Sequence, residues 1–303
     1  MILLEYKIHD LFNEFGILMP RMRYLRSFIE LSRPVNVLLS AAAVALGYWV
    51  ADSRLPWPMP ALLCIAAAAS VAFGNTINDI LDIKTDRISH PKRPLPSGNI
   101  SVLHASLFCG ICACIAVGTA STVSAQHFVG VAIPIVLLSA YALYLKGTPL
   151  VGNFLVSLLV AYPLLFGGLT GPNISRLYIP AFLAFLLNTI REILKDIQDM
   201  DGDTAADLHT TAHLAQKSIK QLITSFSLLY VLLVFAPLFL HQFGIVYAAI
   251  SLLIVLPLHA YWTRHLLLNP LSTVAGRCAS FIKIEMLAGL IAIAADNALR
   301  HYW

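Results

Sequence analysis

Long uncharged tracts dominate the pattern of hydrophobic and polar positions along the chain. Aspartate, glutamate, lysine and arginine are absent from six tracts, which are 34–51, 55–78, 94–145, 147–175, 177–190 and 221–263. A helix that crosses a bilayer needs about 20 apolar residues, so the two longest tracts must each hold two helices. Polar and glycine residues mark the expected breaks, near Ser124–His127 and His241–Gly244.

These tracts predict an all-α polytopic membrane protein with about nine spans. The expected positions of the spans are 34–50, 58–80, 102–122, 127–145, 149–170, 177–198, 221–240, 244–262 and 279–297. The composition agrees with this prediction, because 58% of the residues are hydrophobic and only 12% are charged. A mean hydropathy of +0.78 excludes a soluble globular domain.

The basic residues predict the orientation of the chain in the membrane. With the N-terminus inside and nine spans, only Arg54, Arg176 and Arg300 fall on the outer side. The formal net charge of +4 therefore reflects topology, and it does not indicate a nucleic-acid partner. We expect a multi-pass protein of the cell inner membrane whose N-terminus and polar loops are cytoplasmic. It should form one domain over 1–303, with an amphipathic cytoplasmic segment at 1–33 and the bundle at 34–303.

Two acidic segments follow the second and the sixth expected spans and hold half of the 16 acidic residues. If the second span stays helical through Asp86, then Asn78, Asp82 and Asp86 lie on one helical face, with Asp79 beside them. The second segment has a similar helical spacing of acids, at Glu192, Asp196, Asp199 and Asp203. Both segments are expected at the cytoplasmic membrane face.

Such clustered carboxylates require a compensating cation. Two unit charges 4 Å apart repel by about 4 kcal/mol at an effective dielectric constant near 20. Oxygen ligands favour Mg²⁺, which usually binds through one or two carboxylates together with substrate phosphates. The pattern therefore predicts a phosphorylated ligand held by Mg²⁺. Six basic residues are candidates for direct contacts to it, namely Arg87, Lys92, Arg93, Lys146, Arg191 and Lys195. A solvated loop is the ordinary explanation for one acidic segment, but two matching segments disfavour it.

At these residues the chain resembles the UbiA superfamily of intramembrane prenyltransferases, over nearly its whole length. The resemblance comprises the Asn-x-x-x-Asp-x-x-x-Asp motif, the later Asp-x-x-x-Asp motif and four shorter matches. These are Asn78–Asp82–Asp86, Asp199–Asp203, Arg93–Gly98, Arg33–Asn36, Tyr141 with Lys146, and Gly152–Asn153. The motifs are most similar to the branch that contains digeranylgeranylglyceryl phosphate synthase and chlorophyll synthase.

The resemblance implies nine helices around a central lipid-open cavity and a Mg²⁺-dependent prenyl transfer. An isoprenyl diphosphate and a lipophilic membrane acceptor would be the partners. The implied metal ligands are Asn78, Asp82, Asp86, Asp196, Asp199 and Asp203. All of these except Asp196 are implied to be catalytic, together with Lys146 and Tyr141. The implied substrate-binding residues are Asn36, Asp79, Arg93, Asn153, Arg191, Lys195 and Asp196.

The identity of the acceptor is the open part of this prediction. The branch implies transfer of a geranylgeranyl-type chain to the hydroxyl of a geranylgeranylglyceryl phosphate-like lipid. The chain departs from the expected pattern after the second motif, where it has Asp207–Ala212 in place of a Lys-Thr-Leu-Pro-like segment. An aromatic or chlorin acceptor is therefore an alternative. A cation-coupled transporter is the rival from another class, although it would place its acids at mid-span.

Overall fold

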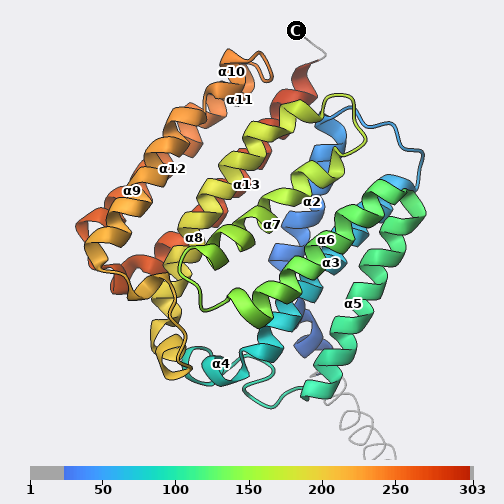
Figure 1. Cartoon of the computed structure of the whole chain (residues 1–303). Coiled ribbons are helices and arrows are strands. Elements are labelled where there is room, and N and C mark those ends of the chain that lie inside the picture. The colour runs from blue at the N-terminus through green and yellow to red at the C-terminus, as the bar shows by residue number, and fades with distance from the viewer. Residues whose placement is uncertain (1–23, 301–303) are drawn as a thin grey trace, which may run out of the picture.

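The computed structural model describes residues 24–300, which form helices and connecting loops without a strand (Figure 1). A helix at Tyr24–Ser32 precedes the long elements. These are α2 (Pro34–Val50), α3 (Met59–Leu81), α4 (Ile83–Ser89), α5 (Val102–Val123), α6 (Ala125–Ala140), η1 (Tyr141–Leu145), α7 (Val151–Gly167), η2 (Ile174–Leu177), α8 (Tyr178–Ala205), η3 (Thr211–His213), α9 (Gln216–Leu233), α10 (Ala236–Phe239), α11 (Ile245–Ile250), η4 (Ser251–Val255), α12 (Leu256–Leu268) and α13 (Leu271–Leu299).

Each of the nine predicted spans corresponds to a helix or to consecutive helices. In the described part of the chain, seven helical stretches are long and apolar enough to cross a membrane. An eighth span arises if the helix Tyr24–Ser32 and α2, which meet at a bend of 49°, are counted together. The remaining predicted span, 149–170, corresponds to α7, an apolar helix of 17 residues. The prediction of an all-α membrane bundle is therefore confirmed.

The long helices lie side by side and enclose the centre of the molecule (Figure 1). α3 packs against α5, α7 packs against both α2 and α8, and α13 packs against α8. One buried apolar cluster joins α8, α9, α12 and α13, with Trp262 fully buried in it. A second cluster joins α2, α3, α5, α6 and α7 around Phe166. α7 and α8 thus connect the two sides of the bundle.

Glycines allow α2 and α7 to touch through their backbones. A Cβ atom on Gly167 would lie 1.9 Å from the Val44 carbonyl oxygen, and one on Gly47 would lie 1.9 Å from the Leu164 carbonyl oxygen. Membrane helices gain stability from such close approach, because van der Waals packing replaces the hydrophobic drive that lipid removes. This crossing fixes one wall of the bundle interior.

The second predicted span, 58–80, coincides with α3 to within one residue at each end. α3 ends at Leu81, and Asp82 joins it to α4, which lies across the end of the bundle (Figure 1). Helical hydrogen bonds continue on both sides of this junction, from Asp82 N to Asn78 O (2.8 Å) and from Asp86 N to Asp82 O (2.7 Å). The condition of one uninterrupted helix through Asp86 is therefore not met, because the helix is interrupted at Asp82. The break at Asp82 allows α4 to pack against α8.

Only part of the expected N-terminal amphipathic segment is described, because 1–23 lie outside the described residues. In the helix Tyr24–Ser32, the side chain of Leu31 is fully buried and packs with Leu95 and Ile100. The Phe28 ring lies 5.1 Å from the Phe108 ring of α5, between centroids. This helix is therefore anchored to the bundle, and the extent of the domain and of its N-terminal segment stays a prediction.

Candidate active site

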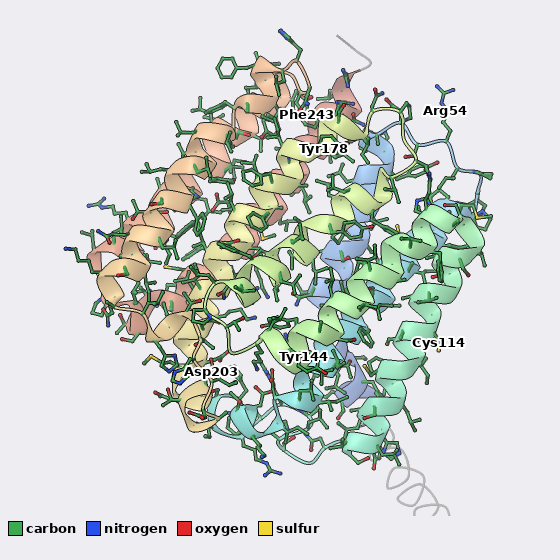
Figure 2. The ribbon with its side chains drawn as sticks, viewed as in Figure 1. Arg54, Cys114, Tyr144, Tyr178, Asp203 and Phe243 are labelled. Carbon is green, nitrogen blue, oxygen red and sulfur yellow. The ribbon has the colours of Figure 1, made fainter. Side chains whose placement is uncertain are left out.

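The two acidic segments meet at one end of the bundle, where Figure 2 labels Asp203; Arg54 is labelled at the opposite end. His90, which follows α4, lies 2.9 Å from Asp199 of α8, between Nε2 and Oδ1. This hydrogen bond joins the segment that follows the first motif to the second motif.

A glycine in the second motif makes this meeting possible. A Cβ atom on Gly202 would lie 2.2 Å from Ser89 Oγ and 2.9 Å from the Thr85 carbonyl oxygen. Real Cβ atoms do not approach other atoms so closely, so α4 can lie against α8 only because residue 202 lacks a side chain. The sequence pattern singled out the aspartates of this segment but gave no sign that the glycine between them matters.

The two aspartates of the first motif, and Asp79 beside them, each contact a basic side chain. Lys146 forms an ion pair with Asp82. Arg93 Nη1 donates to both carboxylate oxygens of Asp86 at 2.7 Å, and Arg33 Nη2 donates to Asp79 Oδ1 at 2.5 Å. Asp79 and Asp86 are almost completely buried, so unpaired charges there would be costly.

The pKa values of Asp82 and Arg93 are both raised at this site, for different reasons. Burial raises the pKa of the Asp82 carboxyl, and the Lys146 ammonium opposes part of that rise. Burial alone would lower the pKa of the Arg93 guanidinium, but the hydrogen bond to Asp86 and the charges of Asp86, Asp79 and Asp199 raise it overall. Arg93 therefore remains a permanent positive charge at the junction of the two motifs.

Local backbone features position Lys146 and Tyr141. α6 ends in the π-helical turn η1, which begins at Tyr141 and is followed directly by Lys146. Single π turns often occur at functional sites, because they redirect side chains at the end of a helix. The Tyr141 ring lines the central cavity, whereas Lys146 turns to Asp82. Both residues thus reach the site from a helix that carries neither acidic motif.

The loop after α4 positions Arg93 through an apolar anchor. Leu95 is buried in the cluster with Leu31 and Ile100, and the backbone N–H of Ser97 donates to the Arg93 carbonyl oxygen at 3.0 Å. Gly98 has a φ of 72°, a left-handed conformation that glycine adopts without the steric cost of a Cβ atom. The Arg93–Gly98 segment is therefore a folded support for the guanidinium.

Asp196 lies in a network that joins α7, α8 and the loop after α8. Its Oδ2 accepts hydrogen bonds from Asn153 Nδ2 at 3.0 Å and from the Thr211 backbone N–H at 3.3 Å. Thr211 Oγ1 donates to Asn153 Oδ1 at 2.6 Å and accepts from the Leu150 N–H at 2.9 Å. Thr211 was not predicted to belong to the site, although it lies in the segment that departs from the family pattern. The sequence offered no signal for its partners.

The remaining predicted residues differ in their burial and in their partners. Asp203 is almost fully buried at the end of α8, within electrostatic reach of Lys146. Arg191 Nη1 and Lys195 Nζ contact Glu192 instead of the motif aspartates, at 2.6 and 2.8 Å. The exposed residues Arg87 and Lys92 make up the rest of the candidate cations.

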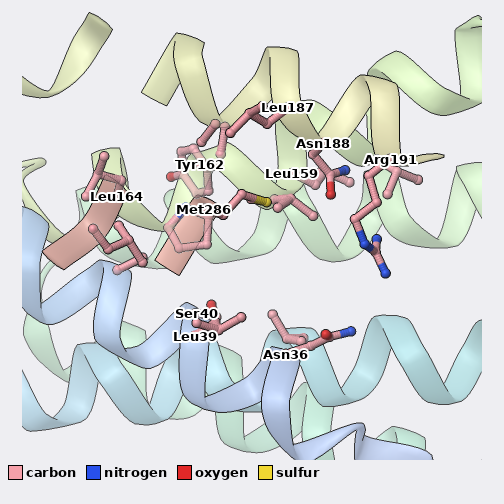
Figure 3. A pocket seen from close by; sticks show the side chains of 18 of the residues that line it. Asn36, Leu39, Ser40, Leu159, Tyr162, Leu164, Leu187, Asn188, Arg191 and Met286 are labelled. Carbon is pink, nitrogen blue, oxygen red and sulfur yellow. The ribbon is translucent and has the colours of Figure 1, made fainter. Parts of the chain in front are cut away.

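A central cavity of about 290 Å³ opens beside this charged end (Figure 3). Asn36 and Asn78 line its polar part, and Tyr162, Leu164 and Met286 line its apolar part. The Asn78 Oδ1 atom is buried without a hydrogen-bond partner, so it is an oxygen ligand available to a metal or a donor. The cavity therefore joins an apolar chamber to an oxygen-rich mouth.

The donor chemistry at this mouth fits a hard divalent cation. In residues 24–300, no three His, Cys, Asp or Glu side chains already lie in metal-binding proximity. Asp82, Asp86 and Asp199 each contact a basic group instead. The oxygens of Asp82, Asp86, Asp199 and Asp203, with the free Asn78 Oδ1, are the ligand type that Mg²⁺ prefers. No thiolate lies among them.

Comparisons with known proteins agree with this geometry. Residues 38–281 match the model of the UbiA prenyltransferase family. The digeranylgeranylglyceryl phosphate synthase of Methanopyrus kandleri is 35% identical over 282 residues, which cover 90% of this chain and 99% of the relative. The solved structure of a digeranylgeranylglyceryl phosphate synthase superposes with a TM-score of 0.72 at 30% identity, covering 90% of this chain and 98% of that one. A UbiA homologue from Archaeoglobus fulgidus bound to DMAPP and Mg²⁺ has the same fold, with a TM-score of 0.65 at 20% identity, covering 88% and 99%. The chain is therefore an integral, multi-pass membrane enzyme that belongs to the UbiA prenyltransferase family.

Proposed function

We propose that this prenyltransferase joins a geranylgeranyl-type chain to the hydroxyl of a glyceryl phosphate lipid. The observation that carries the proposal is the contact between His90, which follows the first acidic motif, and Asp199 of the second, at the mouth of an apolar cavity. The 35% identity to a digeranylgeranylglyceryl phosphate synthase over 90% of the chain supports the choice of acceptor.

The donor diphosphate would lie among the motif carboxylates and their cations. Mg²⁺ would be held by Asp82, Asp86, Asp199 and Asp203 with the Asn78 amide oxygen, and Asp196 would support α8 from behind. The bound metal would supply positive charge to the diphosphate oxygens, as expected from the homologue that binds DMAPP and Mg²⁺. The assignment of these residues as metal ligands rests on the chemistry of their oxygen atoms and on the free Asn78 Oδ1 atom.

The basic residues of the site would stabilise the leaving group. Lys146 and Arg93 are held among the carboxylates, so they would share their charge between carboxylate and phosphate oxygens as the diphosphate departs. Tyr141 and Asn36 line the cavity beside this region and would orient the reacting carbon. Asn153 would act indirectly, because it holds Asp196 and Thr211 in place.

The transfer itself requires a dry cavity. The carbon–oxygen bond to the diphosphate breaks, an ether bond forms to the acceptor hydroxyl, and the hydroxyl proton is released. Water would capture the allylic cation, so the apolar walls around Leu164 and Met286 would protect it. We also propose that the charged mouth faces the cytoplasm of an inner membrane, since the positive-inside distribution of Lys and Arg favours that orientation.

The test is transfer by purified protein supplied with geranylgeranyl diphosphate, geranylgeranylglyceryl phosphate and Mg²⁺. The expected result is an ether lipid, identified by mass, and release of diphosphate. Asp82→Asn and Asp199→Asn should each reduce turnover by about 100-fold or more, because each removes a carboxylate charge from the mouth. Asp201→Asn is the matched control, since Asp201 is exposed on the same helix. Turnover retained in both test variants would refute the assignment of the site.

A further inference from the structure

A second set of charges lines the cavity beyond the two motifs. Arg33, Arg191, Glu192, Lys195 and Lys283 all contribute to the cavity wall. Within the described chain, the carboxylates of Asp82, Asp86, Asp199 and Asp203 lie outside this lining. The cationic cluster, defined as Arg33, Arg191, Lys195 and Lys283, therefore belongs to the chamber that would hold an acceptor.

The charges of this cluster do not balance. Glu192 neutralises one charge through Arg191 and Lys195, and Asp79 neutralises Arg33. Lys283 lies within electrostatic reach of Arg33, Arg191 and Lys195, which repel it, and of Glu192, which attracts it. Glu285 also lines the cavity, so four cations and three carboxylates leave an excess of one positive charge.

Two donors of the cluster are free to bind a ligand. In residues 24–300, the Lys283 ammonium has neither a hydrogen-bond nor an ion-pair partner. The Arg191 Nε atom is buried and also lacks an acceptor. Unpaired cationic groups inside a membrane are costly, so they normally mark a binding site for an anion or an ion pathway. A phosphate monoester carries a charge of about −1.5 to −2 at neutral pH, opposite in sign to the excess charge of the cavity wall.

Arg191 lies deeper along α8 than the motif aspartates, whereas Lys195 lies between them and Arg191. Lys195 and Asp199 are one helical turn apart on α8, about 6 Å along the axis, and Arg191 is about 12 Å from Asp199. Arg191 lies about 18 Å from Asp203 by the same measure. These separations leave room for two anions on one helix, the outer one among the aspartates and the inner one at the cluster.

We infer that Lys283, Arg191 and Lys195 bind the phosphate of the acceptor and thereby select a lipid phosphate over uncharged or aromatic acceptors. The inference rests on the proposed function, since it names the subsite for that reaction's second substrate. Arg33, the N-cap residue of α2, is the fourth cation of the cluster, and its guanidinium is held by a hydrogen bond to Asp79. Lys283 is a residue of α13, which carries neither motif, and no sequence pattern singled it out.

The test compares two acceptors that differ only in phosphate, geranylgeranylglyceryl phosphate and geranylgeranylglycerol. Lys283→Met should raise the KM for the phosphorylated acceptor about tenfold or more, because it removes a charged hydrogen-bond donor. Its effect on the dephosphorylated acceptor and on the KM for geranylgeranyl diphosphate should stay within about twofold, and Lys283→Arg should restore much of the loss. Lys217→Met is the control, because Lys217 is exposed on α9 and lies outside the site.

A binding measurement separates this inference from the proposed function. Geranylgeranylglyceryl phosphate should raise the Tm of the wild-type protein and raise that of Lys283→Met much less. Equal losses with both acceptors would indicate a structural role and overturn the inference. A matching rise in the KM for the diphosphate would assign the cluster to the donor, which also overturns it. Ligand stabilisation that depends on Lys283 without transfer would refute the proposed function alone.

Discussion

The docking of α4 on α8 predicts that a single methyl group on Gly202 impairs donor binding. In Gly202→Ala, the new Cβ atom would lie 2.2 Å from Ser89 Oγ and 2.9 Å from the Thr85 carbonyl oxygen. Ser89 can rotate away, but Thr85 O belongs to the backbone of α4 and moves only with the helix. Ordinary contact begins near 3.4 Å, so α4 must shift by about 0.5 Å.

This shift changes the geometry of the donor site, because α4 and the loop after it carry Asp86, His90 and Arg93. A misplacement of 1 Å can cost about 100-fold in rate, so a shift of half that size should cost roughly tenfold. Overpacking at the contact should also lower the free energy of unfolding by about 1–3 kcal/mol. We therefore expect a folded protein whose kcat/KM for geranylgeranyl diphosphate falls about tenfold.

The assay is steady-state transfer with varied geranylgeranyl diphosphate, alongside the Tm of the purified protein. Gly110→Ala is the matched control, because a Cβ atom there meets nothing within 4 Å. Adding Ser89→Ala to Gly202→Ala should recover only part of the loss, since the contact with Thr85 O persists. Wild-type kinetics in Gly202→Ala would contradict the reasoning that α4 docking positions the donor site.

Three further predictions test the bundle and its metal. Gly167→Ala places a Cβ atom 1.9 Å from the Val44 carbonyl oxygen, so the Tm and the yield of folded protein should fall; an unchanged Tm would disprove the tight crossing. Glu285→Leu removes the acceptor for Trp262 Nε1 and His259 Nδ1 and should cost about 1–3 kcal/mol of stability, measured by thermal unfolding. Glu285→Gln keeps an acceptor and should cost less, and equal losses in both variants would argue against the network. Chelation of divalent metal should abolish transfer and added Mg²⁺ should restore it; turnover that persists in the chelator would exclude a metal-dependent mechanism.

The sequence by itself determined the span count, the fold class and the main chemistry. Bilayer thickness requires about 20 apolar residues for each helix, so the uncharged tracts reveal the spans without knowledge of their packing. The helical repeat likewise brings Asp199 and Asp203 to neighbouring positions on one helix, whatever surrounds them. Oxygen-rich motifs beside basic residues then predicted a phosphorylated ligand and Mg²⁺, and the family resemblance implied that the ligand is an isoprenyl diphosphate.

Tertiary structure decided which partner each of these charges contacts. The bond between His90 and Asp199 depends on α4 turning at Asp82 and docking against Gly202, which no local pattern encodes. The cavity position of Lys283 likewise depends on the packing of α13 against α8, elements about 90 residues apart along the chain. The physical reason is that periodicity reports which face of one helix is apolar or charged, whereas an ion pair or a binding site depends on how the faces of several helices meet.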